Sequence, residues 1–374
     1  MEDNKSIYSL YYQWWKNIDK FIFFLIILLF TTGLFFSLVS TSLLVSDKLD
    51  TNDYTFFFKH LTFVFLGIII IFILSSINEE KLFKISPTIF LLSLMTLFLV
   101  PIIGVEVNSA QRWIDLYFLP RFQPIELVKP FLIILISLIL SSEKYTNVYF
   151  KYLFSFLITL IIALLLAAQP DIGQTLLVFF SWSVLIFISG INVVFLITSC
   201  FILSVAFYFL IKFVPKFEYI KNRILSFFDS ETGTHNLQSE KAIDSITSGG
   251  YFGKGIGEGT LKNLVPEAHT DYIISVISEE FGVIAIILIL LLFLIFIYSV
   301  FKKVYLENEE RTKLVLVGCI SLILVQAMIH IGVNIRLFPT TGMTLPFISY
   351  GGSSIISISI LSGIILNLTK RKIN

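Results

Sequence analysis

The chain has 374 residues, of which 56% are hydrophobic and 14% are charged. Soluble domains carry roughly 25% charged residues, so this composition excludes an ordinary water-soluble protein and predicts an integral membrane protein. The net charge of +1 gives no basic surface for a nucleic acid. The two cysteines, Cys200 and Cys319, lie in apolar runs, where we expect neither a disulfide nor a metal site.

Ten apolar runs follow one another along the chain. A membrane-spanning helix needs about 20 mostly apolar residues. Runs of that kind lie at 20–41, 57–76, 86–105, 125–141, 151–168, 172–190, 192–214, 271–301, 312–335 and 345–368. The sequence therefore predicts an all-α polytopic membrane protein of about ten transmembrane helices, in a single domain over residues 1–374.

The distribution of lysine and arginine predicts the orientation. These residues gather before the first run, after the tenth, and between the second and third, fourth and fifth, and eighth and ninth runs. Positively charged loops stay in the cytoplasm. We therefore expect cytoplasmic termini at residues 1–19 and 369–374. The same rule predicts a long extracytoplasmic loop, residues 215–270, between the seventh and eighth helices.

The first polar cluster, residues 112–129, includes the start of the fourth run. Glu126 and Lys129 are spaced i, i+3, so an ion pair within the helix is one explanation for them. Arg112, Arg121 and Arg336 fall on the predicted outer side, where the orientation rule disfavours positive charge. Guanidinium groups match the geometry of phosphate. We therefore hypothesise an anionic ligand that carries a pyrophosphate.

A second polar segment separates the fifth and sixth runs. Gln169, Pro170 and Asp171 place a proline beside an acid at the start of a helix. A helix-initiating turn is the simpler explanation, and a contribution of Gln169 and Asp171 to a polar cavity is the alternative.

A glycine-rich segment, residues 248–259, lies in the predicted outer loop. No strand precedes it, and neither of the common nucleotide-binding spacings is present, so we exclude a nucleotide site. Dense glycine lets the backbone fold closely at the membrane surface, as a re-entrant or substrate-covering loop requires.

The eighth run begins directly after an acidic segment. Asp271 stands at the start of the predicted helix, where the helix dipole and free N–H groups favour an ionised carboxylate. Glu267 and His269 are close enough in sequence to tune it as a base, although simple helix capping is the alternative. Glu279 and Glu280 follow inside the apolar run, where carboxylates need a polar cavity or a partner.

Several motifs resemble those of the SEDS family (shape, elongation, division and sporulation) of bacterial peptidoglycan glycosyltransferases. The similarity runs from about residue 100 to the C-terminus. The motifs occur in the order of the family and comprise RWI at 112–114, FQPIELVK at 122–129, QPDIG at 169–173, PEAHTD at 266–271 and TLPFISYGGSS at 344–354. Ala268 and Thr344 resemble the division branch of the family more than its elongation branch. Asn263 departs from the glutamate that some division members carry.

The resemblance implies a polymerase that joins lipid II units at the outer face of the cytoplasmic membrane during septal cell-wall synthesis. It marks Asp271 as the family's essential aspartate, which we hypothesise to act as the catalytic general base, and it ties Arg121 and Lys129 to the lipid-linked substrate. The full set of candidate substrate-binding residues is Arg112, Trp113, Arg121, Lys129, Gln169, Asp171, Glu267 and His269.

The resemblance also implies partners. We expect a class B penicillin-binding protein, other membrane proteins of the division machinery, and the lipid bilayer itself. The sequence shows no metal site, although a divalent cation (Mg²⁺ or Mn²⁺) beside the pyrophosphate stays an open alternative. The alternative functions are a lipid II flippase, an elongation-type polymerase and a non-catalytic division scaffold.

Overall fold

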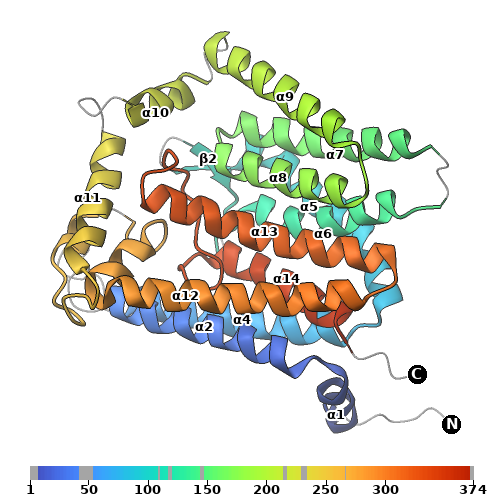
Figure 1. Ribbon diagram of the computed structural model, residues 1–374, viewed down its shortest axis with the longest axis horizontal. Coiled ribbons are helices and arrows are strands. Elements are labelled where there is room, and N and C mark those ends of the chain that lie inside the picture. The colour runs from blue at the N-terminus through green and yellow to red at the C-terminus, as the bar shows by residue number, and fades with distance from the viewer. Residues whose placement is uncertain are drawn as a thin grey trace.

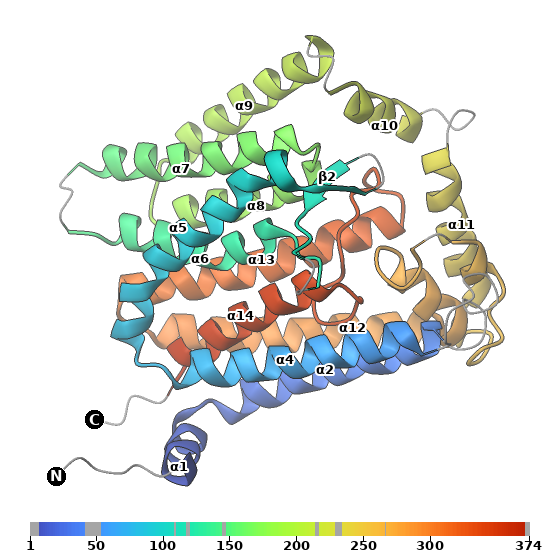
Figure 2. The same cartoon turned by 180° about the vertical axis from the view of Figure 1, so that it is seen from behind.

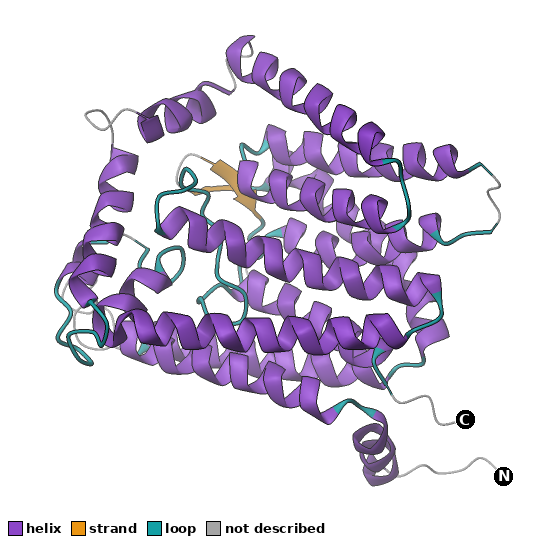
Figure 3. Ribbon diagram, in the orientation of Figure 1, coloured by secondary structure: helices purple, strands orange, loops and turns teal. Residues whose placement is uncertain are grey.

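A computed structural model describes residues 7–41, 54–107, 110–116, 120–143, 147–213, 217–228, 234–265 and 267–370 (Figure 1). The extreme ends of the two predicted cytoplasmic termini and Pro266 of the PEAHTD motif lie outside the described residues. The described residues are mainly helical, with one small sheet (Figure 3).

The first half of the chain contains α1 (Ile7–Asn17), α2 (Lys20–Thr41), α4 (Thr55–Ser76), α5 (Glu79–Ile103), β1 (Val105–Val107), β2 (Ala110–Trp113), α6 (Pro124–Leu140), α7 (Val148–Ala168) and α8 (Ile172–Ile188). The second half contains α9 (Val193–Phe213), α10 (Glu218–Phe228), α11 (Thr234–Gly249), the 3₁₀ turn η2 (Leu261–Leu264), α12 (Ile273–Leu306), α13 (Glu310–Asn334) and α14 (Gly352–Leu368).

Each of the ten predicted runs contains a helix. Six described helices, α2, α4, α5, α7, α12 and α13, are long and apolar enough to cross a membrane by length and composition. Two shorter apolar helices, α8 and α14, accompany them. The polytopic all-α prediction is confirmed, and the total of ten crossings stays a prediction.

The long helices lie side by side in one bundle (Figure 1 and Figure 2). At one end of this bundle, α10, α11 and the small sheet gather, whereas α1 and the end of α14 lie at the other. The predicted outer loop at 215–270 is therefore largely structured, because α10, α11 and η2 fall within it.

Two helix starts differ most from the apolar runs. α5 begins at Glu79, seven residues earlier than its run, because the Asn78 side chain caps it by accepting from Glu80 N at 3.2 Å. α14 begins at Gly352 and not at Leu345. The residues between form a turn in which Ser349 Oγ accepts from Leu345 N at 2.9 Å.

The small sheet was not predicted. β1 and β2 are antiparallel, with Val105 opposite Trp113 and Val107 opposite Ala110 (Figure 3). A further bridge joins Ile114 to Phe122. This pairing folds the segment between α5 and α6 back on itself, so it fixes the RWI motif directly before the start of α6.

α12 is broken near its start. Gly282 has φ 78° and ψ 179°, which is not helical. A Cβ atom at this position would overlap the carbonyl of Tyr251, so a glycine is required both by the backbone angle and by the close approach. The long remainder after Gly282 is the part that can cross the bilayer.

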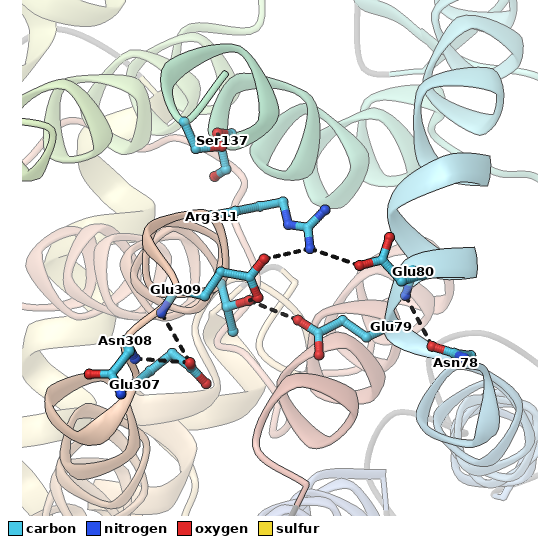
Figure 4. A network of polar contacts seen from close by, with 10 residues as sticks. Asn78, Glu79, Glu80, Ser137, Glu307, Asn308, Glu309 and Arg311 are labelled. Atoms are coloured by element: carbon cyan, nitrogen blue, oxygen red, sulfur yellow. Dashed lines mark hydrogen bonds and ion pairs between the residues drawn. The ribbon is translucent and has the colours of Figure 1, made fainter. Parts of the chain in front are cut away.

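The segments predicted to be cytoplasmic meet at one end of the bundle (Figure 4). Arg311 lies between Glu309, at 2.6 Å, and Glu80, at 3.3 Å. Thr312 Oγ1 donates to Glu79 Oε1 at 2.8 Å. The connection between α12 and α13 is therefore bonded to the start of α5.

Two more contacts bring the segments before α2 and at the end of α14 to the same end. Lys303, in the last turn of α12, pairs with Asp19 before α2 at 2.6 Å. Asn367, near the end of α14, donates to the carbonyl of Ile77 at 2.7 Å. A chain that begins and ends on the same side crosses the membrane an even number of times, so this arrangement supports an even count.

Candidate active site

A cavity of about 1510 Å³ opens at the end of the bundle that carries α10, α11 and the small sheet. Its walls come from α4, β2, the starts of α6 and α8, α10, α11, the 267–272 segment and the 340–354 segment. Ligand pockets for small molecules typically occupy about 300–1,000 Å³. The cavity is therefore large enough for a ligand well beyond the size of a single sugar.

Six of the nine candidate residues line this cavity. They are Arg112, Trp113, Arg121, Asp171, Glu267 and Asp271. The other three, Lys129, Gln169 and His269, are not among the lining residues. The segments that the sequence placed on the outer side thus converge, although they are far apart in the chain.

Two hydrogen bonds hold the backbone of Asp271 in place. Asp271 N donates to Glu267 O at 3.0 Å, and Asp271 O accepts from Asn334 Nδ2 at 3.0 Å. The N-cap of α12 is Tyr272, without a side-chain cap bond. The capping alternative for Asp271 is therefore wrong. Its carboxylate faces the cavity beside Gly342, where an added Cβ would lie 3.6 Å from Asp271 Oδ2.

The surroundings of Asp271 shift its acidity. Burial, together with the negative charge of Glu267, raises the pKa of Asp271 to about 7. Arg223 and Arg112 oppose this shift, because positive charges favour the carboxylate. A carboxylate with a pKa near neutrality can accept and release a proton at physiological pH, which suits a general base.

His269 fixes the loop that carries Asp271. Its ring packs against Phe56, with centroids 4.7 Å apart, and lies 6.2 Å from the ring of Tyr350. The carbonyl of His269 accepts from Tyr350 N at 3.2 Å. Burial lowers the pKa of His269, although Glu267 opposes the shift. His269 therefore positions the loop in its neutral form.

Arg112 and Asp171 join two walls of the cavity. Arg112 Nε donates to Gln169 O at 3.2 Å and lies 3.7 Å from Asp171 Oδ2. Asp171 Oδ1 also accepts from Gln174 N at 3.3 Å, which caps α8. Both interpretations of this turn are thus correct for Asp171, since it initiates α8 and lines the cavity. Gln169 contributes through its backbone carbonyl.

Lys129 lies behind the cavity wall. Lys129 Nζ pairs with Glu126 Oε2 at 2.9 Å, and both side chains are almost fully buried. Gln174 Nε2 donates to Glu126 Oε1 at 2.8 Å, and Glu126 and Gln174 both line the cavity. The predicted i, i+3 ion pair is confirmed. Through Glu126, Lys129 neutralises an acid in the wall.

Further basic side chains line the cavity. The Arg121 side chain is 58% exposed and pairs with Asp115 at 2.8 Å. Lys59 of α4 and Arg223 of α10 also line the cavity, and the sequence analysis missed both. Lys59 is a lone lysine near the start of an apolar run, and Arg223 lies in the long predicted loop, so neither showed a pattern.

A polar stripe on α13 holds the other side of the site, and it was also missed. Gln326, His330 and Asn334 recur every four residues, so they share one face of an apolar helix. Gln326 Nε2 donates to Thr344 O at 3.0 Å, and His330 Nδ1 lies 2.7 Å from Met343 O. The four-residue spacing in the sequence is the signal that could have found this stripe.

The described residues include no group of three or more His, Cys, Asp or Glu side chains that could hold a metal ion. Positive charge for an anionic ligand comes from the arginine and lysine side chains that line the cavity.

The family model of FtsW, RodA and SpoVE, described as cell cycle proteins, matches residues 19–374. The chain belongs to this family. The SEDS resemblance, which the motifs of the sequence indicated, is therefore confirmed.

Relatives in the family match along nearly the whole chain. A protein of Wigglesworthia glossinidia brevipalpis named "Probable peptidoglycan glycosyltransferase FtsW" is 33% identical over 96% of this chain and 93% of its own length. Its namesake in Caulobacter vibrioides is 29% identical over 96% of this chain and 91% of its own length. These relatives carry the name of the division member.

Solved structures share the fold. A chain of a peptidoglycan synthase complex, described for its coordination of polymerization and crosslinking, has a TM-score of 0.77 and 27% identity. It covers 94% of this chain and 97% of its own. A mutant of the rod shape determining protein RodA of Thermus thermophilus has a TM-score of 0.70 and 26% identity, with coverages of 94% and 97%.

Proposed function

We propose that this protein is a peptidoglycan glycosyltransferase that polymerises lipid II at the outer face of the cytoplasmic membrane. The observation that carries the proposal is the position of Asp271, a carboxylate of raised pKa in a large cavity that is also lined by arginine and lysine. The glycosyltransferase names of the FtsW relatives support the same activity.

In the proposed reaction, Asp271 acts as the general base. It takes the proton from the 4-hydroxyl of the acceptor sugar, whose oxygen attacks the anomeric carbon of the donor. The new glycosidic bond forms as the bond to undecaprenyl pyrophosphate breaks, with inversion at that carbon. Glu267 keeps the pKa of Asp271 high enough for it to accept the proton near neutral pH.

The leaving group is a pyrophosphate, so negative charge grows on it as the bond breaks. Arg112, Arg121, Lys59 and Arg223 line the same cavity as Asp271. Positively charged donors placed where charge develops stabilise the transition state. Guanidinium groups suit this task because their paired N–H donors match phosphate oxygens.

We further propose that the protein works with a class B penicillin-binding protein at the division septum and that both termini are cytoplasmic. The likeness to a chain of a peptidoglycan synthase complex supports a crosslinking partner. The position of α1 and the end of α14 at the end opposite the cavity supports the placement of the termini.

The test is polymerisation of labelled lipid II by the purified protein, with and without a cognate transpeptidase. Asp271→Asn keeps the shape of the side chain and removes the base, so glycan chains should disappear while expression and thermal melting stay unchanged. Asp244→Asn is the matched control, because Asp244 is an exposed acid of α11 and is not among the cavity-lining residues.

An Asp271→Asn protein that still makes chains would refute the base assignment. If the wild-type protein makes no chains with any partner and instead moves lipid II across liposome membranes, the flippase alternative replaces the proposal.

A further inference from the structure

The glycine-rich loop, residues 249–259, completes the backbone hydrogen bonds of the broken helix α12. Val283 N donates to Gly250 O at 3.0 Å, and Ile284 N donates to Tyr251 O at 3.3 Å. In the other direction, Lys254 N donates to Glu279 O at 2.8 Å. The loop is thus bonded to both sides of the break at Gly282, which holds it in one place.

A buried carboxylate strengthens this attachment. The Glu279 side chain is fully buried and receives hydrogen bonds from Lys254 Nζ at 2.9 Å and from Ser245 Oγ at 3.0 Å. It also accepts from Thr260 N at 2.9 Å and from Leu261 N at 3.0 Å. Glu279 therefore has the partner that a carboxylate inside an apolar run needs. Its carboxylate ties the two ends of the loop to α12.

The tip of this rigid loop is apolar and exposed. The exposed fractions are 76% for Tyr251, 82% for Phe252 and 63% for Ile256. A soluble surface seldom carries three large apolar side chains in one short segment without a partner. The loop therefore presents an apolar surface that something other than water covers.

The neighbours of the tip identify that partner. Val283 and Ile284, which bond to the loop, are exposed apolar residues of α12, and Ile287 follows one turn later. They belong to a helix that is long and apolar enough to cross the membrane. The tip thus continues the lipid-facing surface of α12 toward the end of the bundle that carries the cavity. Tyrosine and other aromatic residues favour the boundary between hydrocarbon and headgroups.

We propose that the tip of the glycine-rich loop, Tyr251, Phe252 and Ile256, inserts into the outer leaflet of the bilayer, with Glu279 as the residue that holds it there. Irregular backbone at membrane depth is tolerated only where its polar groups are satisfied by protein. The hydrogen bonds to Glu279, Val283 and Ile284 satisfy part of the loop backbone in this way. The proposal stands apart from the glycosyltransferase proposal, because it concerns a surface outside the cavity.

Fluorescence quenching by lipids tests the insertion. Phe252→Cys, in a Cys200→Ser background, is labelled with an environment-sensitive dye and reconstituted in liposomes of phosphatidylethanolamine and phosphatidylglycerol. The other native thiol, Cys319, is buried and does not compete for the dye. We expect blue-shifted emission and strong quenching by lipids that carry a nitroxide high on the acyl chain.

Two labelled positions calibrate the result. Asp244→Cys on α11 is exposed and polar, so its label should stay unquenched. Leu288→Cys lies on the exposed apolar face of α12, so its label should be quenched best by a deeper nitroxide. A Phe252 label that behaves like the Asp244 label would overturn the proposal. So would a label that becomes protected only when a crosslinking partner protein is added.

The role of Glu279 has its own test. Glu279→Gln removes the charge that Lys254 pairs with, so quenching of the Phe252 label should fall toward the level of the Asp244 label. If that variant does not fold, Lys254→Met removes the same ion pair from its partly exposed side. Unchanged quenching in a folded Lys254→Met protein would refute the role of the ion pair in holding the loop.

Discussion

The two ends of the bundle use the same residue types in different ways. At the end that carries the termini, Arg311 is bonded to Glu309 and Glu80 in a network that joins helices (Figure 4). At the other end, Arg112, Arg121 and Asp271 line a large cavity. Arg112 and Arg121 also have acidic partners, Asp171 and Asp115. The difference is that the pairs at this end line a space that a ligand can enter, whereas the pairs around Arg311 join helices.

The largest effect should come from the buried ion pair of Lys129 and Glu126, which lies behind the cavity wall. Lys129→Met leaves Glu126 charged and buried without its partner, which typically costs about 3–5 kcal/mol of stability. Denaturation of the purified protein should show the loss. The double variant Lys129→Met/Glu126→Gln removes both charges and should recover part of it. A stable single variant would mean that Glu126 becomes protonated or finds another donor.

Substitution of Arg121 should lower activity and leave stability unchanged, in contrast to substitution of Lys129. Its side chain is largely exposed, so the pair with Asp115 contributes little stability. A charge-assisted hydrogen bond to the leaving pyrophosphate is worth about 1.5–3 kcal/mol. Arg121→Gln should therefore lower kcat/KM by roughly 10- to 150-fold with unchanged melting. A variant with full activity would exclude Arg121 from contact with the pyrophosphate.

The pH dependence sharpens the assignment of the base. Because a base must be deprotonated and the pKa of Asp271 is raised to about 7, polymerisation should fall as the pH drops through about 7. Glu267→Gln removes a negative charge that raises this pKa, so the acidic limb should move to lower pH. The profile of kcat/KM over pH measures the shift. An unmoved limb would assign the titration to another group.

The smallest effect should come from the bonded network at the opposite end. Arg311→Met removes partly exposed ion pairs, which are worth roughly 0–1 kcal/mol. Thermal melting should fall slightly, while polymerisation per folded molecule stays unchanged. A large loss of activity would show that the two ends are coupled.

The parts of the fold that the sequence predicted depend on local signals. Apolar runs of sufficient length placed each long helix, and the charge pattern grouped the segments that meet around Arg311 and Asp19. The i, i+3 spacing predicted the pair of Glu126 and Lys129. Spacing alone did not show that Lys129 is buried behind the cavity wall, because that depends on which helix faces pack together.

Other features depend on contacts between distant segments. The pairing of β1 with β2 involves strands of three and four residues, too short to stand out in a sequence. The break in α12 falls inside an apolar run, and its cause is the loop that occupies the space beside Gly282. Arg223 reaches the cavity only because α10 folds over the end of the bundle.

The break at Gly282 also bears on how the protein is made. The chain reaches the glycine-rich loop before it reaches α12, so the carbonyls of Gly250 and Tyr251 are synthesised before the amides to which they bond. The amides of Val283 and Ile284 then find acceptors without crossing the hydrocarbon unpaired. The acceptors that complete the broken helix are therefore made before the helix itself. This helix, α12, follows Asp271 in the chain.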